Sequence, residues 1–398
     1  MMEPHSLYLH IPFCRKRCGY CDFNTFAGLE GLIPAYVQAL ITEIEGLGEL
    51  SERSLPVHTI FFGGGTPSLL SAEQVGAILM AARGAFQVLP GAEISLEANP
   101  GTLSAEGLMA LREAGINRLS FGVQSMHPGE LALLERMHGV PEVIEAVAWA
   151  RQAGFDNLNL DLIYGLPGQT VQRWRETLEF ALRLKPEHLS LYALTIEEGT
   201  PLQRLSAKGL VEAVDDDRAA DMYEMAMDIL AEAGYRQYEI SNWALTGGDR
   251  KLLSCRHNLQ YWYNLPYLGL GAGAHGYSHG RRTVDVRGVK QYIQAVQCAW
   301  QVFPESPANE SVTEIARRDE IGETMMVGLR LTEEGVSAKR FKERFGQSLE
   351  AAYPDQIAYF SKAGLLEWAG AGDERCLRLT RKGRLLGNQV FAAFLADD

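Results

Sequence analysis

The sequence has 398 residues, of which 46% are hydrophobic and 22% are charged, and its formal net charge is −13. A chain of this length exceeds one ordinary hydrophobic core, because single cores stop growing at about 250 to 300 residues, so we expect more than one domain. The acidic excess disfavours a protein that grips nucleic acid, because phosphate backbones are bound through Lys and Arg.

The sequence predicts neither a targeting segment nor a membrane span. No apolar run approaches the roughly 20 residues that cross a bilayer. The first residues, MMEPHSLYLHIPFC, lack the basic flank and the apolar stretch of a secretory signal. We therefore expect a cytoplasmic protein, for which only peripheral contact with a membrane stays open.

Short strand-like runs alternate with helical patterns from residue 7 to about residue 200. The expected strands are LYLHIP, HTIFFGG, EISLEANP, NRLSFGVQS, LNLDLIYGLPG and HLSLYAL, and the helices between them cover 34–49, 71–88, 104–114, 130–153 and 170–184. Parallel strands need a crossover helix to return the chain, so this alternation indicates a parallel sheet. Residues 1–200 therefore predict an α/β fold, a partial (β/α)6 barrel.

Segments of different character follow the predicted barrel. A helix is expected at about 215–233, and the aromatic, Gly-rich stretch 235–290 is expected to form loops and a few strands. We therefore expect residues 201–305 to extend and close the barrel. Residues 306–398 are mostly helical in pattern and end with the strand-like CLRLT, which predicts a small, mainly helical, winged-helix-like C-terminal domain.

Unusual residues gather where the expected strands end. Three cysteines follow the first strand, GGGTP follows the second, Glu97 and Asn99 close the third, and Gln124 closes the fourth. In (β/α) barrels the chemistry gathers at the C-terminal ends of the strands. The coincidence predicts a functional site at this end of the barrel.

Cys14, Cys18 and Cys21 have the spacing C-x3-C-x2-C. This spacing lets three thiolates reach three corners of one cubane cluster, and an amino acid moiety can then chelate the open iron. A zinc site of three cysteines and His10 is the alternative, because structural zinc takes four N or S ligands. The remaining cysteines, expected to be buried or incidental thiols, are Cys255, Cys298 and Cys376.

Several motifs of the N-terminal half form a recognisable set: YLHIPFCRKRCGYCDF, FFGGGTPSLL, SLEANP, GVQS and YGLPGQT. Together they resemble the radical SAM family around oxygen-independent coproporphyrinogen III oxidase, and the resemblance extends over nearly the whole chain. It implies a [4Fe–4S] cluster on Cys14, Cys18 and Cys21, with S-adenosylmethionine on the open iron. The cofactor carries out such chemistry, so no catalytic side chain is assigned.

Side chains at the strand ends suit a zwitterionic nucleoside. Gly64 and Gly65 lack side chains, so the backbone can approach a ligand's amino group, and Thr66 adds a hydroxyl. Glu97 can accept a hydrogen bond from a ribose hydroxyl.

The resemblance implies the other contacts with S-adenosylmethionine. Gln124, Arg136 and Asp161 would supply further donors and an acceptor, although each alone would be an ordinary solvated group. The least direct assignments are Tyr8 beside the methionine moiety, Tyr20 beside the adenine, and Ala193 along the adenosine.

The chain departs from the oxidase in two places. The oxidase motif continues to a fourth cysteine, where this sequence has Phe23. Strand one is expected to begin by about residue 7, so the preceding segment, which helps form the oxidase's substrate site, is expected to be missing. Phe23, together with HNLQYW at 257–262, read as H-N-x-x-Y-W, instead resembles the heme chaperones related to that oxidase.

His257 opens the H-N-x-x-Y-W motif and is the candidate heme ligand. An imidazole can ligate heme iron axially, and Tyr261 and Trp262 can cover a flat macrocycle. From the residues alone, a hydrogen-bonded packing histidine is the alternative. The other candidate ligands are His275, His279 and Cys255.

The resemblance therefore implies a radical SAM protein that binds heme and hands it to acceptor hemoproteins, including membrane-bound respiratory ones, without coproporphyrinogen oxidase activity. The alternative is an enzyme that uses S-adenosylmethionine to decarboxylate coproporphyrinogen III oxidatively. Radical modification of RNA is disfavoured, because the composition lacks a basic surface and we recognise no RNA-binding domain.

Overall fold

The computed structural model describes residues 3–248, 251–300 and 302–395. The chain divides into two compact units: unit 1 is Met1–Ala233 with Pro266–Thr313, and unit 2 is Gly234–Leu265 with Glu314–Asp398. The expected middle segment, 201–305, contributes to both units, and the division into three domains stays a prediction. Within the described ranges, every helix is too short or too polar to span a bilayer.

Parallel strands form the centre of unit 1, as predicted. In order they are β1 (His5–Ile11), β4 (Pro56–Gly64), β5 (Gln87–Ala98), β6 (Arg118–Gln124), β7 (Leu158–Tyr164) and β8 (His188–Ala193), each paired in parallel with the next. Leu7, Leu9 and Ile11 of β1 are fully buried. Because side chains alternate along a strand, these three apolar residues share one face of the sheet, and Ser6, Tyr8 and His10 lie on the other.

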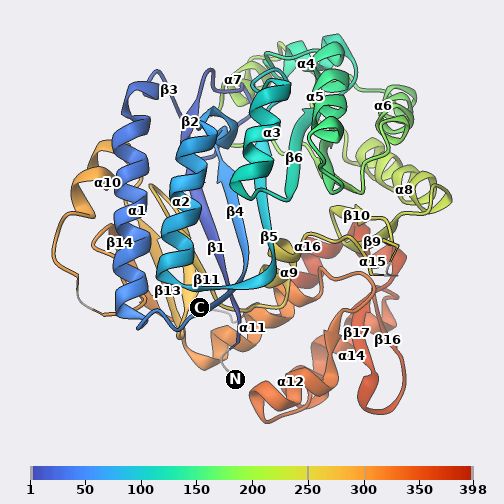
Figure 1. Ribbon diagram of the computed structural model, residues 1–398. Coiled ribbons are helices and arrows are strands. Elements are labelled where there is room, and N and C mark those ends of the chain that lie inside the picture. Colours follow the sequence, from blue (N-terminus) through green and yellow to red (C-terminus); the bar gives the residue numbers. More distant parts are fainter. Residues whose placement is uncertain (1–2, 249–250, 301, 396–398) are drawn as a thin grey trace. The chain divides into compact units, whose positions relative to one another are not determined.

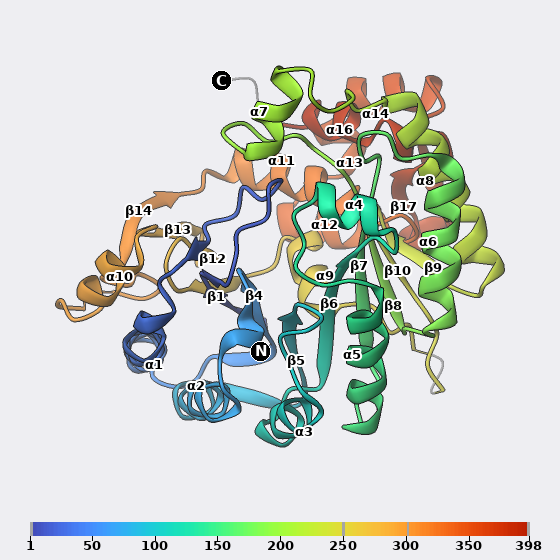
Figure 2. The same cartoon turned by 90° about the horizontal axis from the view of Figure 1, so that it is seen from above.

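Helices connect these strands on the outer side of the sheet. They are α1 (Ile33–Leu50), α2 (Ala72–Ala85), α3 (Ala105–Ala114), α4 (Pro128–Leu133), α5 (Val140–Gln152) and α6 (Val171–Arg183). Figure 1 shows α1, α2 and α3 side by side in front of the strands, and Figure 2 shows the strands curving with the helices outside. The expected partial (β/α) barrel is confirmed.

The helix expected over 130–153 is interrupted. It forms α4 and α5, because Glu135 has a left-handed backbone, with φ 55°, and Pro141 stands in the first turn of α5. Proline fits the first turn of a helix but not its interior. The interruption places Arg136 in a loop rather than on a helix.

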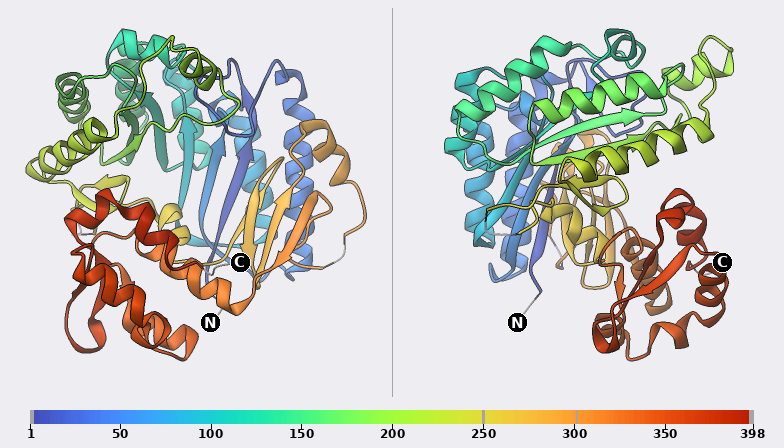
Figure 3. Two further views of the ribbon diagram at one scale, coloured as in Figure 1. Left: turned by 180° about the vertical axis from the view of Figure 1, so that it is seen from behind. Right: turned by 90° about the vertical axis from the view of Figure 1, so that its right-hand side faces the viewer.

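The remaining elements of unit 1 extend the sheet beyond β1. β11 (Tyr267–Leu270) pairs in parallel with β1, and β12 (His275–Ser278), β13 (Arg281–Asp285) and β14 (Asn309–Glu314) follow in order. Figure 3 shows these orange strands beside the blue β1. The other elements are β2 (Phe13–Cys14), β3 (Phe26–Ala27), η1 (Glu30–Leu32), η2 (Pro67–Leu69), α7 (Pro201–Ala207), α8 (Asp216–Glu232) and α10 (Val289–Ala295).

Unit 2 contains the expected mainly helical, winged-helix-like domain. Its antiparallel sheet has the order β15 (Val336–Ser337), β17 (Cys376–Leu379), β16 (Leu366–Ala369). Phe341, Leu377 and Phe394 belong to its hydrophobic core. The other elements are β9 (Arg236–Glu239), β10 (Asn242–Ala244), α9 (Arg256–Trp262), α11 (Arg317–Gly328), α12 (Ala338–Phe345), α13 (Leu349–Ala352), α14 (Pro354–Lys362), η3 (Gly372–Glu374), α15 (Arg381–Leu385) and α16 (Gly387–Ala392).

A buried pair of carboxyl groups fastens the added strands of unit 1 to α1. Glu43 accepts hydrogen bonds from the Gly271 amide (2.9 Å), the Tyr292 hydroxyl (2.6 Å) and the Ser306 hydroxyl (2.5 Å). Asp285 is 1% exposed. Burial, followed by the charge of Glu43, raises the pKa of Asp285 well above its ordinary value. Burial also raises the pKa of Glu43, but its three hydrogen-bond donors favour the ionised form, so we assign the proton of the pair to Asp285.

We expect Asp285→Asn to make the stability of the protein less dependent on pH. Above about pH 4 the unfolded chain releases this proton while the folded protein keeps it. The stability contributed by Asp285 is therefore complete below about pH 4, and it is lost as the pH rises toward the folded pKa, at up to about 1.4 kcal/mol per pH unit. Urea unfolding of the unmodified protein and of Asp285→Asn at pH 5 and pH 8 measures the free energy of unfolding. An equal loss of stability between the two pH values in both proteins would contradict the prediction.

Candidate metal centre

The three cysteines of the predicted site lie in one loop after β1. The short strands β2 and β3 pair in parallel and close this loop, and the Phe26 amide donates to the Pro12 carbonyl at 2.7 Å. The Leu202 amide, at the start of α7, donates to the Gly19 carbonyl at 2.8 Å. The shape of the loop is thus fixed by backbone hydrogen bonds that do not depend on the cysteine side chains.

All six cysteines of the chain fall within the described residues and are free thiols. Burial raises the pKa of the Cys14 thiol, and the neighbouring Cys21 and Cys18 raise it further. All three thiols belong to the one loop between β1 and β3. Three neighbouring thiols from one short loop are the donor set that a cubane cluster with one open iron requires, so the residues fit the group.

Side chains from other parts of the barrel donate hydrogen bonds to these sulfurs. The Thr66 hydroxyl, just after β4, donates to the Cys14 sulfur at 3.6 Å. The Arg136 guanidinium, from the loop between α4 and α5, donates to the Cys18 sulfur at 3.4 Å. These predicted pocket residues therefore lie beside the thiols, and their donors suit sulfur that carries negative charge.

His10 does not supply the fourth ligand that a zinc site would need. Its Nδ1 lies 3.1 Å from the Tyr8 hydroxyl and its Nε2 lies 2.9 Å from the Asn24 carbonyl oxygen. Both ring nitrogens are thus engaged and neither is available to a metal. Among the residues that the structure describes, no three His, Cys, Asp or Glu side chains are grouped as ligands of a single metal ion would be.

The GGGTP turn packs tightly against β1 and the cysteine loop. The Gly65 amide donates to the Ile11 carbonyl at 2.8 Å, and a Cβ at Gly65 would lie 2.7 Å from the Phe13 carbonyl oxygen. Gly64 has φ 109°, and a Cβ there would lie 2.5 Å from the His10 ring. We expected glycine at these positions to let a ligand approach the backbone. The structure shows that contacts within the protein itself also leave no room for a side chain there.

Carboxyl groups stand near the end of β5 and in the middle of β7. Glu97 accepts a hydrogen bond from the Gly64 amide at 3.1 Å. Burial, followed by the charge of Asp161, raises the pKa of Glu97 to about 8. Asp161 accepts from the Ser120 hydroxyl (2.9 Å) and the Asn159 amide (2.8 Å). A carboxyl group with a pKa near neutrality can donate or accept, so Glu97 suits a hydroxyl-bearing ligand.

The other predicted pocket residues lie on the same strands and loops. Gln124 ends β6 with φ 68°, a left-handed conformation that is strained for a residue with a side chain. Such strain gathers at functional sites. The remaining ones are Tyr8, stacked against Phe61 with ring centroids 6.3 Å apart; Tyr20, packed against the cluster that includes Leu134 and Leu202; and Ala193, exposed at the end of β8.

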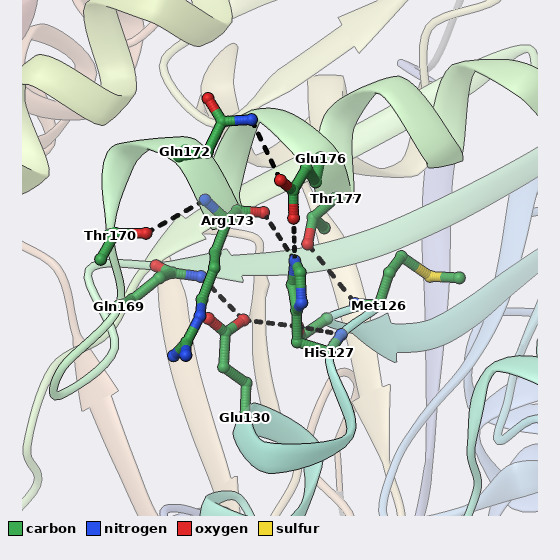
Figure 4. Close-up of polar contacts among 10 residues, drawn as sticks. Met126, His127, Glu130, Gln169, Thr170, Gln172, Arg173, Glu176 and Thr177 are labelled. Carbon is green, nitrogen blue, oxygen red and sulfur yellow. Dashed lines mark hydrogen bonds and ion pairs between the residues drawn. The ribbon is translucent and has the colours of Figure 1, made fainter.

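A buried polar network supports the segment between Gln124 and Arg136 (Figure 4). Glu130 of α4 is 4% exposed and accepts hydrogen bonds from the Ser125 hydroxyl (2.6 Å) and the Gln169 amide (3.1 Å). These contacts tie the loop after β6 to the loop after β7. This network was not predicted from the sequence, although Gln169 belongs to the GLPGQT motif.

The H-N-x-x-Y-W motif lies in unit 2 and forms the helix α9, where loops and strands were expected. His257 is 1% exposed, and its Nε2 lies 2.9 Å from the Tyr261 hydroxyl, one helical turn away. The Arg330 guanidinium covers the Trp262 ring at 4.3 Å from its centroid. Axial ligation by His257 would therefore require the imidazole to leave Tyr261 and become exposed.

The alternative heme ligands have different surroundings. His275 and His279 are exposed and belong to unit 1. Cys255 is fully buried, immediately before α9. Exposure favours the histidines of unit 1 as first contacts for a ligand, whereas the motif favours His257.

Two family models match separate parts of the chain. Residues 8–181 match the Radical SAM superfamily, and residues 315–386 match the HemN C-terminal domain. The heme chaperone HemW of Bacillus subtilis is 42% identical over 394 residues, which is 98% of this chain and 99% of the relative. The heme chaperone HemW of Escherichia coli is 40% identical over 300 residues, which is 74% of this chain and 76% of the relative.

A solved structure has the same fold. The radical SAM enzyme coproporphyrinogen III oxidase (HemN) of Escherichia coli matches with a TM-score of 0.81 and 25% sequence identity. The match covers 99% of this chain and 90% of that chain. Sequence and fold thus point to the same superfamily.

Proposed function

Because this chain belongs to the family of radical SAM heme chaperones named HemW, we propose that it binds heme and delivers it to acceptor hemoproteins. The observation that carries the proposal is the 42% identity to a heme chaperone along 98% of the chain. The acceptors would include membrane-bound respiratory hemoproteins, and delivery would take place from the cytoplasm.

We further propose that Cys14, Cys18 and Cys21 hold a [4Fe–4S] cluster whose open iron takes the amino and carboxylate groups of S-adenosylmethionine. Such a cluster supplies one electron to a bound sulfonium. The hydrogen bonds of Thr66 and Arg136 to the sulfurs support this assignment. The other residues proposed around S-adenosylmethionine are Tyr8, Tyr20, Gly64, Gly65, Glu97, Gln124, Asp161 and Ala193.

His257 is the proposed axial ligand of heme. Its imidazole is a ligand type that heme iron accepts, and the rings of Tyr261 and Trp262 lie in the same helix. Because His257 is buried and bonded to Tyr261, heme binding would be coupled to a rearrangement of α9.

Oxidative decarboxylation of coproporphyrinogen III is the second candidate function. The fold likeness to the oxidase, with a TM-score of 0.81, favours it. Phe23 opposes it, because this exposed phenyl ring stands where the oxidase motif has a fourth cysteine.

An anaerobic comparison of the two activities tests the proposal. The reconstituted protein is incubated with S-adenosylmethionine, a reductant and coproporphyrinogen III, and a second sample is titrated with heme. We expect no protoporphyrinogen above a control without the protein, and a saturable Soret change with heme. Porphyrinogen turnover at enzymatic rates, or a heme titration without a Soret change, would overturn the chaperone function.

A further inference from the structure

A continuous hydrogen-bonded bridge through Asn99 joins two of the cysteine thiols. The side-chain oxygen of Asn99, at the end of β5, accepts from the Arg136 guanidinium, and its side-chain nitrogen donates to the Thr66 hydroxyl at 3.0 Å. Arg136 and Thr66 then donate to the sulfurs of Cys18 and Cys14, at 3.4 and 3.6 Å. Asn99 is thus hydrogen-bonded to both Arg136 and Thr66, the two side chains that donate to the cysteine sulfurs.

The chemistry of the side chains fixes the direction of this bridge. A guanidinium only donates, so Asn99 must turn its oxygen to Arg136 and its NH2 group to Thr66. The hydroxyl of Thr66 accepts that N–H, which leaves its own hydrogen free to point at the Cys14 sulfur. Asn99 therefore orients the donors of both sulfurs.

The turn that carries Asn99 holds the side chain in place. The Asn99 amide donates to the Ser68 hydroxyl at 3.4 Å, and its carbonyl accepts from the Thr102 hydroxyl at 2.6 Å. The hydroxyls of Ser68 and Thr102 also lie 2.7 Å apart, and Gly101 completes the turn with φ 81°. The side-chain amide of Asn99 is thus positioned by the turn that carries it before any cofactor binds.

We propose that Asn99 is a positioning residue for the iron–sulfur cluster, which directs the hydrogen bonds of Arg136 and Thr66 onto two cluster thiolates. Hydrogen bonds to these sulfurs stabilise the reduced, more negative cluster and so raise its reduction potential. Outer partners of metal ligands also affect metal affinity, typically by 10- to 100-fold. The inference rests on the proposed cluster but not on heme delivery.

Substitutions of Asn99 separate the two arms of the bridge. Asn99→Ala removes both bonds and should make the midpoint potential more negative and the loss of iron to a chelator about tenfold faster. Asn99→Asp keeps an acceptor for Arg136 but replaces the donor to Thr66 by an acceptor, which would draw the Thr66 hydrogen away from Cys14. Because the Asp side chain also adds a negative charge, we expect Asn99→Asp to have the more negative midpoint potential of the two variants.

Asn117→Ala is the matched control. Its side chain also bonds at both ends, to the Ala92 carbonyl and the Ile94 amide, each at 2.8 Å, but it stands just before β6, away from the strand's C-terminal end. We expect the midpoint potential of the cluster and the rate of iron loss in Asn117→Ala to match those of the unmodified protein.

The potentials are measured by paramagnetic resonance during redox titration of the reconstituted full-length proteins without S-adenosylmethionine. Unchanged potential and iron retention in both Asn99 variants would overturn the proposal. So would an Asn117→Ala shift equal to that of Asn99→Ala, since Asn99 would then be merely structural. Absence of iron and sulfide from the unmodified protein would instead identify the cluster assignment as the failure.

Discussion

Replacing any one of Cys14, Cys18 or Cys21 by alanine should abolish the brown iron–sulfur chromophore. A cubane held at three corners loses an anchor with each substitution, and the proposed fourth corner is reserved for a small molecule. The His10 ring is engaged at both nitrogens and cannot take over as a ligand. Anaerobic reconstitution followed by absorption spectra and analysis of iron and sulfide measures the loss.

Cys298→Ala is the control for these variants. Cys298 is an exposed free thiol outside the loop, so its replacement should leave the full chromophore. The backbone bonds that close the loop, such as that from the Phe26 amide to the Pro12 carbonyl, survive all four substitutions. A full cluster retained in any of the three loop variants would refute its ligand assignment.

His257→Ala should weaken heme binding and alter the heme spectrum of the protein, and it should leave the iron–sulfur absorption intact. The heme motif belongs to unit 2, whereas the cysteine loop belongs to unit 1, so the two cofactors draw on different parts of the fold. We expect heme affinity to fall at least about tenfold, which corresponds to roughly 1.4 kcal/mol. Heme titrations of the anaerobic proteins, followed in the Soret band, measure it.

Further variants distinguish ligation by His257 from a role in packing. Tyr261→Phe keeps the imidazole and removes the hydroxyl bonded to its Nε2, so heme should bind at least as tightly as in the unmodified protein. His275→Ala and His279→Ala should leave the Soret band unchanged. If His257→Ala lost heme and iron–sulfur absorption equally, His257 would be a folding residue.

Much of unit 1 could be predicted because its strands and helices alternate clearly in the sequence. The break between α4 and α5 could not, because it depends on the backbone of Glu135 as well as on Pro141. The helix α9 was also missed. Its aromatic composition and Gly-rich surroundings favour strands and loops, but Tyr261 and His257, four residues apart, contact each other across one helical turn.

The candidate site was predictable where residues act close together in sequence. The spacing of Cys14, Cys18 and Cys21 is local, so it indicates a cluster directly. The role of Asn99 is not local: its partners Thr66 and Arg136 lie 33 and 37 residues away, and only the folded barrel brings them together. The same holds for Glu130 and Gln169, which are 39 residues apart.

The most direct test of the proposed function is the transfer of heme to an acceptor. Heme-loaded, anaerobically reconstituted protein is mixed with an acceptor hemoprotein that lacks its heme, and both Soret bands are followed with time. We predict that the acceptor gains heme and activity faster than it does from an equal amount of heme in buffer, as the chaperone's own band declines. An acceptor that fills no faster than from buffer, while heme stays on this protein, would contradict delivery.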